Sequence, residues 1–257
     1  MKTINYILSA LIMLMSHGIF SQYDLSRFKH INSIYITSYW GNINAVGTKS
    51  GINQEFALEV THTDNSNRSN KINKVSEYVI IQEKNNKLYI ESRKPKGFES
   101  IDLDLKIPED IFLEIKLFKG GDIYVDNFKN GVEVNSLNGS VKIERISEYA
   151  FVNAANGEIV AKFNQVNKKK PISLVTMNGG ITAVLPENCS RDLRLISRKN
   201  GYIESDFDIE SSELITNLNV KKYAREPIIN TAKINGGGAL LFLSTENGPL
   251  TIKKNSL

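Results

Sequence analysis

Cysteine, histidine and proline are scarce in this 257-residue chain, which has one Cys, three His and six Pro. A single cysteine, Cys189, excludes an internal disulfide framework. Three histidines leave little material for a zinc site or a nucleophilic triad. Beyond the N-terminus there is no apolar run of about twenty residues, the length that a membrane-spanning helix needs. A disulfide-stabilised domain, a zinc or triad enzyme and a helical membrane protein are therefore not expected.

A strong charge of one sign is also missing. Lys and Arg number 32 against 28 Asp and Glu, which gives a net charge of +4, and the basic residues are dispersed along the chain. A nucleic-acid-binding domain gathers its basic residues on one face or helix, so no nucleic-acid partner is expected. With 41% hydrophobic and 23% charged residues, the composition is that of a folded globular protein.

The N-terminus has the pattern of a signal peptide. Lys2 is followed by no charged residue until Asp24, and the apolar stretch Tyr6–Met15 is too short to span a membrane. Ser21 suits cleavage before Gln22. We therefore predict a leader over residues 1–21 and a single mature domain over 22–257, without a transmembrane segment. The expected location is the periplasm, the cell surface or the medium, and a buried N-terminal helix is the alternative.

Asn-Gly pairs are the most frequent pattern in the sequence. They begin at Asn130, Asn138, Asn156, Asn178, Asn200, Asn235 and Asn247. Asn and Gly tolerate positive φ at little cost, so each pair predicts a tight corner between extended segments. Superposing five of the pairs on their Asn gives intervals of 18, 22, 22 and 47 residues, the last being about two units.

The flanking residues repeat with the pairs. Four residues before the Asn stand Val134, Val152, Leu174, Ile196 and Leu243, and three residues after it stand Val141, Ile159, Ile181, Ile203 and Leu250. Alternation on both sides of a fixed corner predicts strand, corner, strand, with one face of each strand turned inward. A unit of about twenty residues is the size of one coil in a β-solenoid, in which successive coils stack about 4.8 Å apart. Ordinary antiparallel hairpins are the alternative.

The pattern weakens toward both ends. It extends back to Gly121 and Gly41, across a less regular insertion at about residues 61–119. Near the other end, residues 236–257 are expected to form the final coil. Arg198 falls in an inward position of the alignment, which predicts a bulge or a shifted strand there.

The run Gly120-Gly121-Asp122-Ile123-Tyr124-Val125, the repeated Asn-Gly-x-aliphatic strands and the ending Leu241-Phe242-Leu243-Ser244-Thr245-Glu246-Asn247-Gly248 together resemble the bacterial putative-adhesin β-strand-repeat family. The resemblance covers roughly residues 34–254. It implies an all-β, parallel, right-handed β-helix or β-solenoid in an exported protein of the cell envelope. The family offers no catalytic residues to carry over.

Motifs for catalysis, cofactors or metals are absent from the sequence, so no catalytic, cofactor-binding or metal site is predicted. The Asn residues at 138, 156, 178, 200 and 247 are expected to form a structural corner ladder, each amide bonding to the next coil. Tyr124, Phe151 and Tyr202 are candidates for an aromatic sugar platform.

Two functions of different class remain. The first is a non-enzymatic envelope scaffold or adhesin, with an envelope or surface glycan, or another envelope protein, as partner. The second is a β-helix lyase or glycosidase acting on acidic glycans. It would use acids such as Asp102 with Asp104, Asp122 with Asp126, or Asp206 with Asp208. An enzyme needs these acids to converge with Lys or Arg in a groove, whereas a scaffold needs only regular faces.

Overall fold

The computed structural model describes residues 23–49, 55–64, 66–71, 75–94, 96–199, 201–211 and 228–255. The expected leader, residues 1–21, lies outside them. Within the described residues the chain is all-β, as predicted. Its helical elements there are two short 3-10 turns, Ser26–Phe28 and Val75–Glu77.

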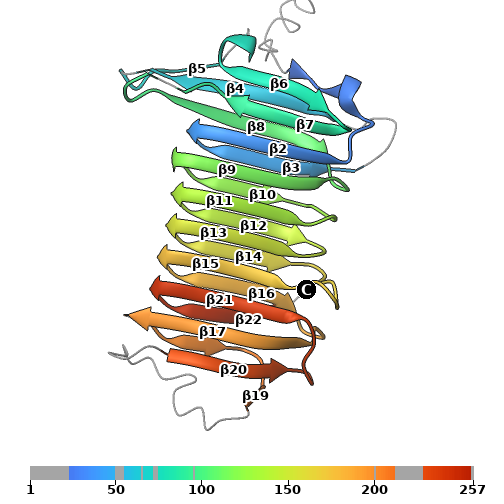
Figure 1. The fold of residues 1–257 in the computed structure, drawn as a ribbon, viewed down its shortest axis with the longest axis vertical. Coiled ribbons are helices and arrows are strands. Elements are labelled where there is room, and N and C mark those ends of the chain that lie inside the picture. The colour runs from blue at the N-terminus through green and yellow to red at the C-terminus, as the bar shows by residue number, and fades with distance from the viewer. Residues whose placement is uncertain are drawn as a thin grey trace, which may run out of the picture.

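The strands form two eleven-stranded sheets that face each other along an elongated molecule (Figure 1). In spatial order, sheet I contains β1 (Tyr23–Asp24), β4 (Ala57–Thr63), β8 (Ser100–Pro108), β3 (Ile43–Thr48), β10 (Ile123–Asp126), β12 (Val141–Ile146), β14 (Ile159–Phe163), β16 (Ile181–Pro186), β22 (Leu250–Asn255) and β18 (Ile203–Ser205), with β5 (Ser69–Lys71) beside β4. In the same way, sheet II contains β19 (Ile209–Ser211), β20 (Ile228–Ile234), β17 (Arg191–Lys199), β21 (Leu240–Asn247), β15 (Ile172–Asn178), β13 (Ala150–Asn156), β11 (Val132–Asn138), β9 (Phe112–Gly120), β2 (Ser33–Trp40), β7 (Lys87–Ser92) and β6 (Val79–Lys84).

In the middle of the molecule the chain alternates between the sheets. From β9 to β16, each strand of sheet II is followed by a strand of sheet I, and each strand from β11 onward pairs in parallel with the strand two places earlier. We call two such consecutive strands, joined at a glycine corner, a rank. Most pairings in both sheets are parallel, whereas β1, β4, β5, β6, β19 and β20 pair antiparallel near the ends.

The inward side chains form continuous files along the stack. In sheet I one file runs through Leu103, Ile43, Ile123, Val141, Ile159, Ile181, Leu250 and Ile203. In sheet II another runs through Ile90, Ile36, Ile115, Val134, Val152, Leu174, Leu243 and Leu195. Their members are at most 2% exposed. Because burial of such a side chain contributes about 1.5–3 kcal/mol, these files fix the register of each rank.

Glycine is required at the corners by both backbone conformation and space. Gly157 has φ +142°, and a Cβ there would lie 2.0 Å from the carbonyl oxygen of Gly139 in the neighbouring rank. A side chain would therefore separate the ranks. The preceding residue, such as Asn156, ends its strand and is not among the positive-φ residues. At this corner the glycine alone therefore supplies the positive φ.

The order of the ranks departs from the order of the sequence at both ends. β21 lies between β15 and β17, and β22 lies between β16 and β18. In Figure 1, β21 therefore lies on the inner side of β17, and the described residues 236–255 do not form the last rank as expected. In the same way, β2 lies between β7 and β9, and β3 lies between β8 and β10.

Strand β17 is shifted by one residue from the sequence alignment. Leu195, and not Ile196, faces Leu243, and Ser197 takes the inward position beside Thr245. Arg198 is exposed instead, and its Nε lies 3.2 Å from Oε2 of Glu246. The shift avoids burial of a guanidinium in the core, which would cost several kcal/mol without a partner. The predicted irregularity at Arg198 is thereby confirmed as a shifted strand.

The segment expected to be irregular, residues 61–119, contains both kinds of pairing. Its strands β7, β8 and β9 continue the parallel ranks. β6 and β7 form an antiparallel hairpin, in which Asn85 and Asn86 both have positive φ, as two-residue hairpin turns require. The antiparallel strands β4, β5 and β6 lie at the end of the stack next to β7 and β8, which they cover (Figure 1).

Candidate functional site

Side-chain amides run along the glycine corner between ranks. Nδ2 of Asn156 donates to Oδ1 of Asn138 at 2.8 Å, Asn178 donates in the same way to Asn156 at 2.7 Å, and Asn247 donates to Asn178 at 2.7 Å. Asn138 donates to the carbonyl oxygen of Lys119 at 2.6 Å. The amides of Asn138, Asn156 and Asn178 thus both donate and accept, and these contacts add hydrogen bonds between ranks at a solvent-facing corner.

The fifth residue expected in this ladder, Asn200, lies outside the described residues. The position opposite Asn247 belongs to Lys199, because β17 is shifted. Asn247 therefore follows Asn178 directly in space, which the order of the sequence did not indicate.

Hydroxyl groups form a second series just inside the corner. Oγ1 of Thr176 donates to the carbonyl oxygen of Gly157 at 3.0 Å, Thr245 donates to Gly179 at 2.9 Å, and Oγ of Ser197 donates to Gly248 at 2.9 Å. These side chains are nearly or fully buried. At these three positions the hydroxyl thus satisfies a glycine carbonyl oxygen of the neighbouring rank.

Exposed apolar side chains lie in consecutive ranks on the outer face of sheet II, close to the corner. Phe118, Leu137 and Met177 are 53%, 49% and 57% exposed, and Ala155 lies between the last two. We call Phe118, Leu137, Ala155 and Met177 the apolar row. Trp40 pairs with Gly120, two residues beyond Phe118, so an aromatic ring stands close to one end of the row. Exposed apolar side chains gathered in this way mark interaction surfaces.

The ring of Trp40 contacts two neighbouring side chains. Nζ of Lys119 lies 3.5 Å from the ring centroid, and the ring of Phe98 meets it edge-on at 6.4 Å. Phe98 is 79% exposed. This end of the apolar row therefore presents aromatic faces together with a cation.

The aromatic residues suggested from sequence do not form one platform. Tyr124 is in sheet I and Phe151 is in sheet II, while Tyr202 precedes β18. The Tyr124 hydroxyl donates to Oε2 of Glu144 at 3.0 Å. Burial, followed by that hydrogen bond, raises the pKa of Tyr124 to about 12. Phe151 contacts the ring of Tyr149 at 5.1 Å.

A stacked aromatic pair was missed. The rings of Tyr35 and Tyr89 stack on the outer face of sheet II, with centroids 5.1 Å apart and planes at 17°. Each tyrosine stands between two inward aliphatic residues, Ile34 and Ile36 or Leu88 and Ile90. That shared pattern could have indicated facing positions in neighbouring strands.

The acidic pairs considered for catalysis bond to neighbouring ranks. Oδ1 of Asp102 accepts the backbone N–H of Asn42 at 2.7 Å, and Oδ1 of Asp122 accepts that of Ser140 at 2.8 Å. Asp126 forms an ion pair with Arg145, which occupies a bulge with positive φ. Burial, as the largest cause, raises the pKa of Asp102.

The other acids are placed in a similar way. Oδ1 of Asp104 accepts from the amide of Asn44 at 3.0 Å, and Oδ2 of Asp206 accepts the N–H of Lys254 at 3.2 Å. Asp208 is exposed beyond β18. None of the six acids lines either of the two cavities described below.

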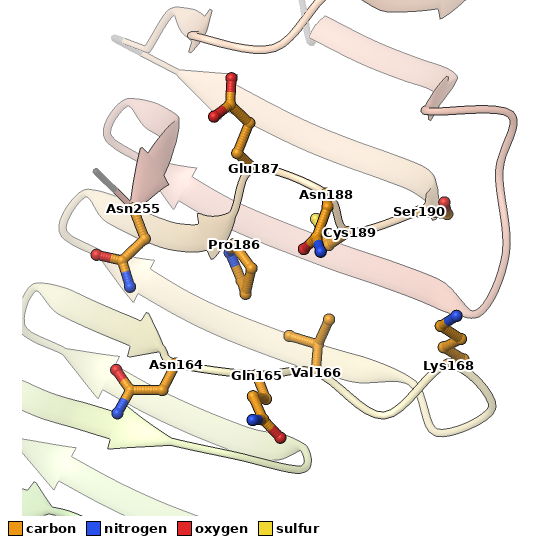
Figure 2. A pocket seen from close by; sticks show the side chains of 10 residues that line it. All are labelled: Asn164, Gln165, Val166, Lys168, Pro186, Glu187, Asn188, Cys189, Ser190 and Asn255. Atoms are coloured by element: carbon orange, nitrogen blue, oxygen red, sulfur yellow. The ribbon is translucent and has the colours of Figure 1, made fainter. Parts of the chain in front are cut away.

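A cavity of about 900 Å³ opens between two connections that lead from sheet I to sheet II. One connection follows β14 and the other follows β16, and Asn255 at the end of β22 closes the third side (Figure 2). Its lining residues are Asn164, Gln165, Val166, Lys168, Pro186, Glu187, Asn188, Cys189, Ser190 and Asn255. A smaller cavity of about 580 Å³ lies at the hairpin turn between β6 and β7, lined by Gln82, Glu83, Lys84 and Tyr89.

Cys189 is buried at the larger cavity, 5% exposed. Burial, as the largest cause, raises the pKa of its thiol, so the thiolate is disfavoured. In the part of the chain that the structure describes, no group of three His, Cys, Asp or Glu side chains is placed to hold a metal ion. No helix there is both long and apolar enough to cross a bilayer.

No protein-family model matches the chain, and no curated protein matches its sequence. Among solved structures, it is similar to a putative cell adhesion protein from Clostridium sporogenes, with a TM-score of 0.46 and 13% identity over 88% of this chain and 94% of that one. It is also similar to a putative adhesin from Bacteroides fragilis, with a TM-score of 0.44 and 14% identity over 91% of this chain and 95% of that one. At such values the function has to be argued from this chain's own residues.

Proposed function

We propose that the two sheets are faces of one parallel, right-handed β-solenoid with coils of about 20 residues, and that it acts as a non-enzymatic binding surface of the bacterial cell envelope. The alternation of strands between the sheets from β9 to β16 supports the winding. The paired residues Val141 and Ile159, and then Ile159 and Ile181, are separated by 18 and 22 residues, which agrees with that coil length.

The apolar row is the observation that carries the binding role. Phe118, Leu137 and Met177 are about half exposed and occupy the same position in their ranks. They face away from the core and therefore have no function in it. Their exposure costs solubility, so a partner that covers them accounts for their presence. Because ranks repeat about every 4.8 Å, a partner with a repeating structure could engage several ranks at once, and weak contacts would then add.

The partner that we propose is a glycan or another protein of the envelope. Trp40 beside Lys119, next to the apolar row, offers a ring face and a cation, which suit both the apolar face and the polar groups of a sugar chain. Adhesion is the corresponding biological role. Catalysis is not part of the proposal, because Asp102, Asp122 and Asp126 are engaged in bonds between ranks.

A binding experiment with a charge-bearing variant tests this proposal. The mature protein is applied to immobilised cell-wall and host glycans and to envelope proteins, with release of sugar products followed in parallel. Binding without product release is expected. Leu137→Lys together with Met177→Lys should weaken binding at least tenfold. Val160→Lys, on the outer face of sheet I, should leave it unchanged. Equal binding by all three proteins, or release of products, would contradict the proposal.

Export is tested separately. We propose that the leader is removed after Ser21, so the mature protein should begin at Gln22. Mass spectrometry of the protein recovered from the envelope and from the medium checks this. A protein that retains residues 1–21 in the cytoplasm would refute an envelope role even if glycan binding were observed in vitro.

A further inference from the structure

We propose that the cavity between the β14–β15 and β16–β17 connections is a binding site for an uncharged sugar, separate from the apolar row. The cavity exists because of the order of the ranks. Earlier connections on this side bond directly to one another through backbone groups: Ser147 N–H donates to the carbonyl oxygen of Phe128 at 3.0 Å, and Asn167 N–H donates to that of Glu148 at 2.9 Å.

That sequence of contacts stops at the cavity. The connection after β16 must reach β17, and β21 occupies the place between β15 and β17. Within the described residues, no backbone hydrogen bond joins residues 164–170 to residues 186–190. The insertion of the β21–β22 rank thus separates two connections that would otherwise lie in contact, and the space between them is large enough for one or two sugar rings.

Three side chains fix the cavity walls. The fully buried guanidinium of Arg191 donates to the carbonyl oxygens of Asn167 at 2.8 Å and Lys170 at 2.9 Å. Nδ2 of Asn235 donates to the carbonyl oxygen of Cys189 at 2.8 Å, and Nδ2 of Asn255 donates to that of Phe163 at 3.1 Å. A site held in this way loses little conformational entropy when a ligand binds.

Carboxamides dominate the polar lining. The side chains of Asn164, Gln165 and Asn188 make no hydrogen bond to another described residue, and Ser190 adds a hydroxyl. A carboxamide donates and accepts at once, and so does each sugar hydroxyl, so the two groups are complementary. Pro186, Val166 and buried Cys189 supply an apolar area that suits the C–H face of a pyranose ring (Figure 2).

The charges at the cavity favour an uncharged ligand. Lys168 and Glu187 have opposite signs, and Glu187 points away from the other lining residues in Figure 2. Its Oε1 lies 3.5 Å from Nζ of Lys254. No cluster of basic side chains is present in the lining to hold a phosphate or an acidic sugar, and no acidic cluster is present to hold a cation.

The test is an NMR titration of the mature protein with D-glucose, D-mannose and N-acetyl-D-glucosamine, with D-galacturonate as the charged comparison. At least one neutral sugar should give saturable shifts in residues 164–168 and 186–190. Asn188→Ala should raise the dissociation constant about tenfold, because it removes a donor and an acceptor. Asn153→Ala, an exposed carboxamide on the outer face of sheet II, is the matched control and should not change it.

Three results would overturn the assignment: no shifts with any neutral sugar, shifts with galacturonate alone, or equal effects of Asn188→Ala and Asn153→Ala. Failure here is distinct from failure of the proposed function. If Asn188→Ala leaves polymer binding intact while the apolar-row variant abolishes it, the sugar site is refuted and the binding face stands. If the sugar titration succeeds and the apolar-row variant binds polymers normally, the binding face is refuted and the sugar site stands.

Discussion

The middle of the stack and its two ends follow different rules. From β9 to β16 the ranks succeed one another in space as they do in the sequence. At each end, the order of two ranks in space differs from their order in the sequence. The strands β2 and β3 lie closer to the middle of the stack than β7 and β8, and β21 and β22 lie closer to the middle than β17 and β18. Short antiparallel strands then cover the outermost ranks.

The difference shows what the repeat pattern determines. Aliphatic residues at fixed offsets from a glycine corner set the register within any pair of neighbouring ranks. They do not determine which ranks are neighbours, because all ranks present nearly the same inward faces. The order must come from features that only some ranks have, such as the shifted strand β17 and the ion pair between Arg198 and Glu246.

Disulfide cross-linking gives the sharpest test of the inserted rank. In a Cys189→Ser background, Met177→Cys with Glu246→Cys should form a disulfide nearly completely, because residues 177 and 246 face each other in neighbouring strands about 5 Å apart. Met177→Cys with Arg198→Cys should form none, because β21 separates those strands. Gel mobility without reductant reads out both. Ranks stacked in sequence order would give the opposite result.

Glycine substitutions compare a rank corner with a turn near one end. Gly157→Val should lower the free energy of unfolding by about 3 kcal/mol or more, because its Cβ would meet the Gly139 carbonyl oxygen and its φ is positive. Gly236 also has positive φ, but no other atom lies within 4 Å of the Cβ that Gly236→Ala would add. Its cost should be about 1–2 kcal/mol. Urea denaturation measures both, and similar losses would show that contact between ranks is not the cause.

The amide ladder should contribute less than the corner glycines. Asn156→Ala removes one hydrogen bond to Asn138 and one from Asn178, both at a solvent-facing position. We expect a loss of about 1 kcal/mol in the free energy of unfolding. Asn153→Ala, on the same strand and without a hydrogen bond to another described residue, should cost less than half of that. Equal losses would assign the effect to strand propensity instead of the ladder.

The smallest expected effect concerns Asp102 in β8. Because burial raises its folded-state pKa above the ordinary value of 3.8, its ionised form destabilises the fold at neutral pH. The penalty is fully present above the folded-state pKa and disappears as the pH falls below 3.8. Asp102→Asn keeps the oxygen that accepts the N–H of Asn42, and should raise the urea midpoint slightly at pH 7 but not at pH 3. A gain of the same size at both values would exclude ionisation as the cause.

Much of the fold follows from the sequence by local physics. The file through Val141, Ile159 and Ile181 and the alternation in Ile101–Ile107 could be predicted because strand period and burial are short-range properties. The position of Leu250 between Ile181 and Ile203 could not. Pairing with either neighbour buries the same aliphatic surface, and the choice depends on contacts far apart in the chain.

The candidate sites divide in the same way. The Asn residues of the ladder carried a visible repeat, and three members of the apolar row, Leu137, Ala155 and Met177, could have been found by reading the residue just before Asn138, Asn156 and Asn178. The cavity could not, since its residues come from two connections and the end of β22, and they are brought together only by the inserted rank. Arg191 gave no signal either, because a buried guanidinium that binds carbonyl oxygens resembles any surface arginine in the sequence.

The internal place of β22 also has a mechanical consequence. Tension applied at Asn255 would not peel an outer layer from the molecule, because β22 is bonded to β16 on one side and β18 on the other. Both rows of hydrogen bonds would have to shear together before the strand could slide out. A protein anchored through this strand would therefore resist traction better than one held by an outermost rank.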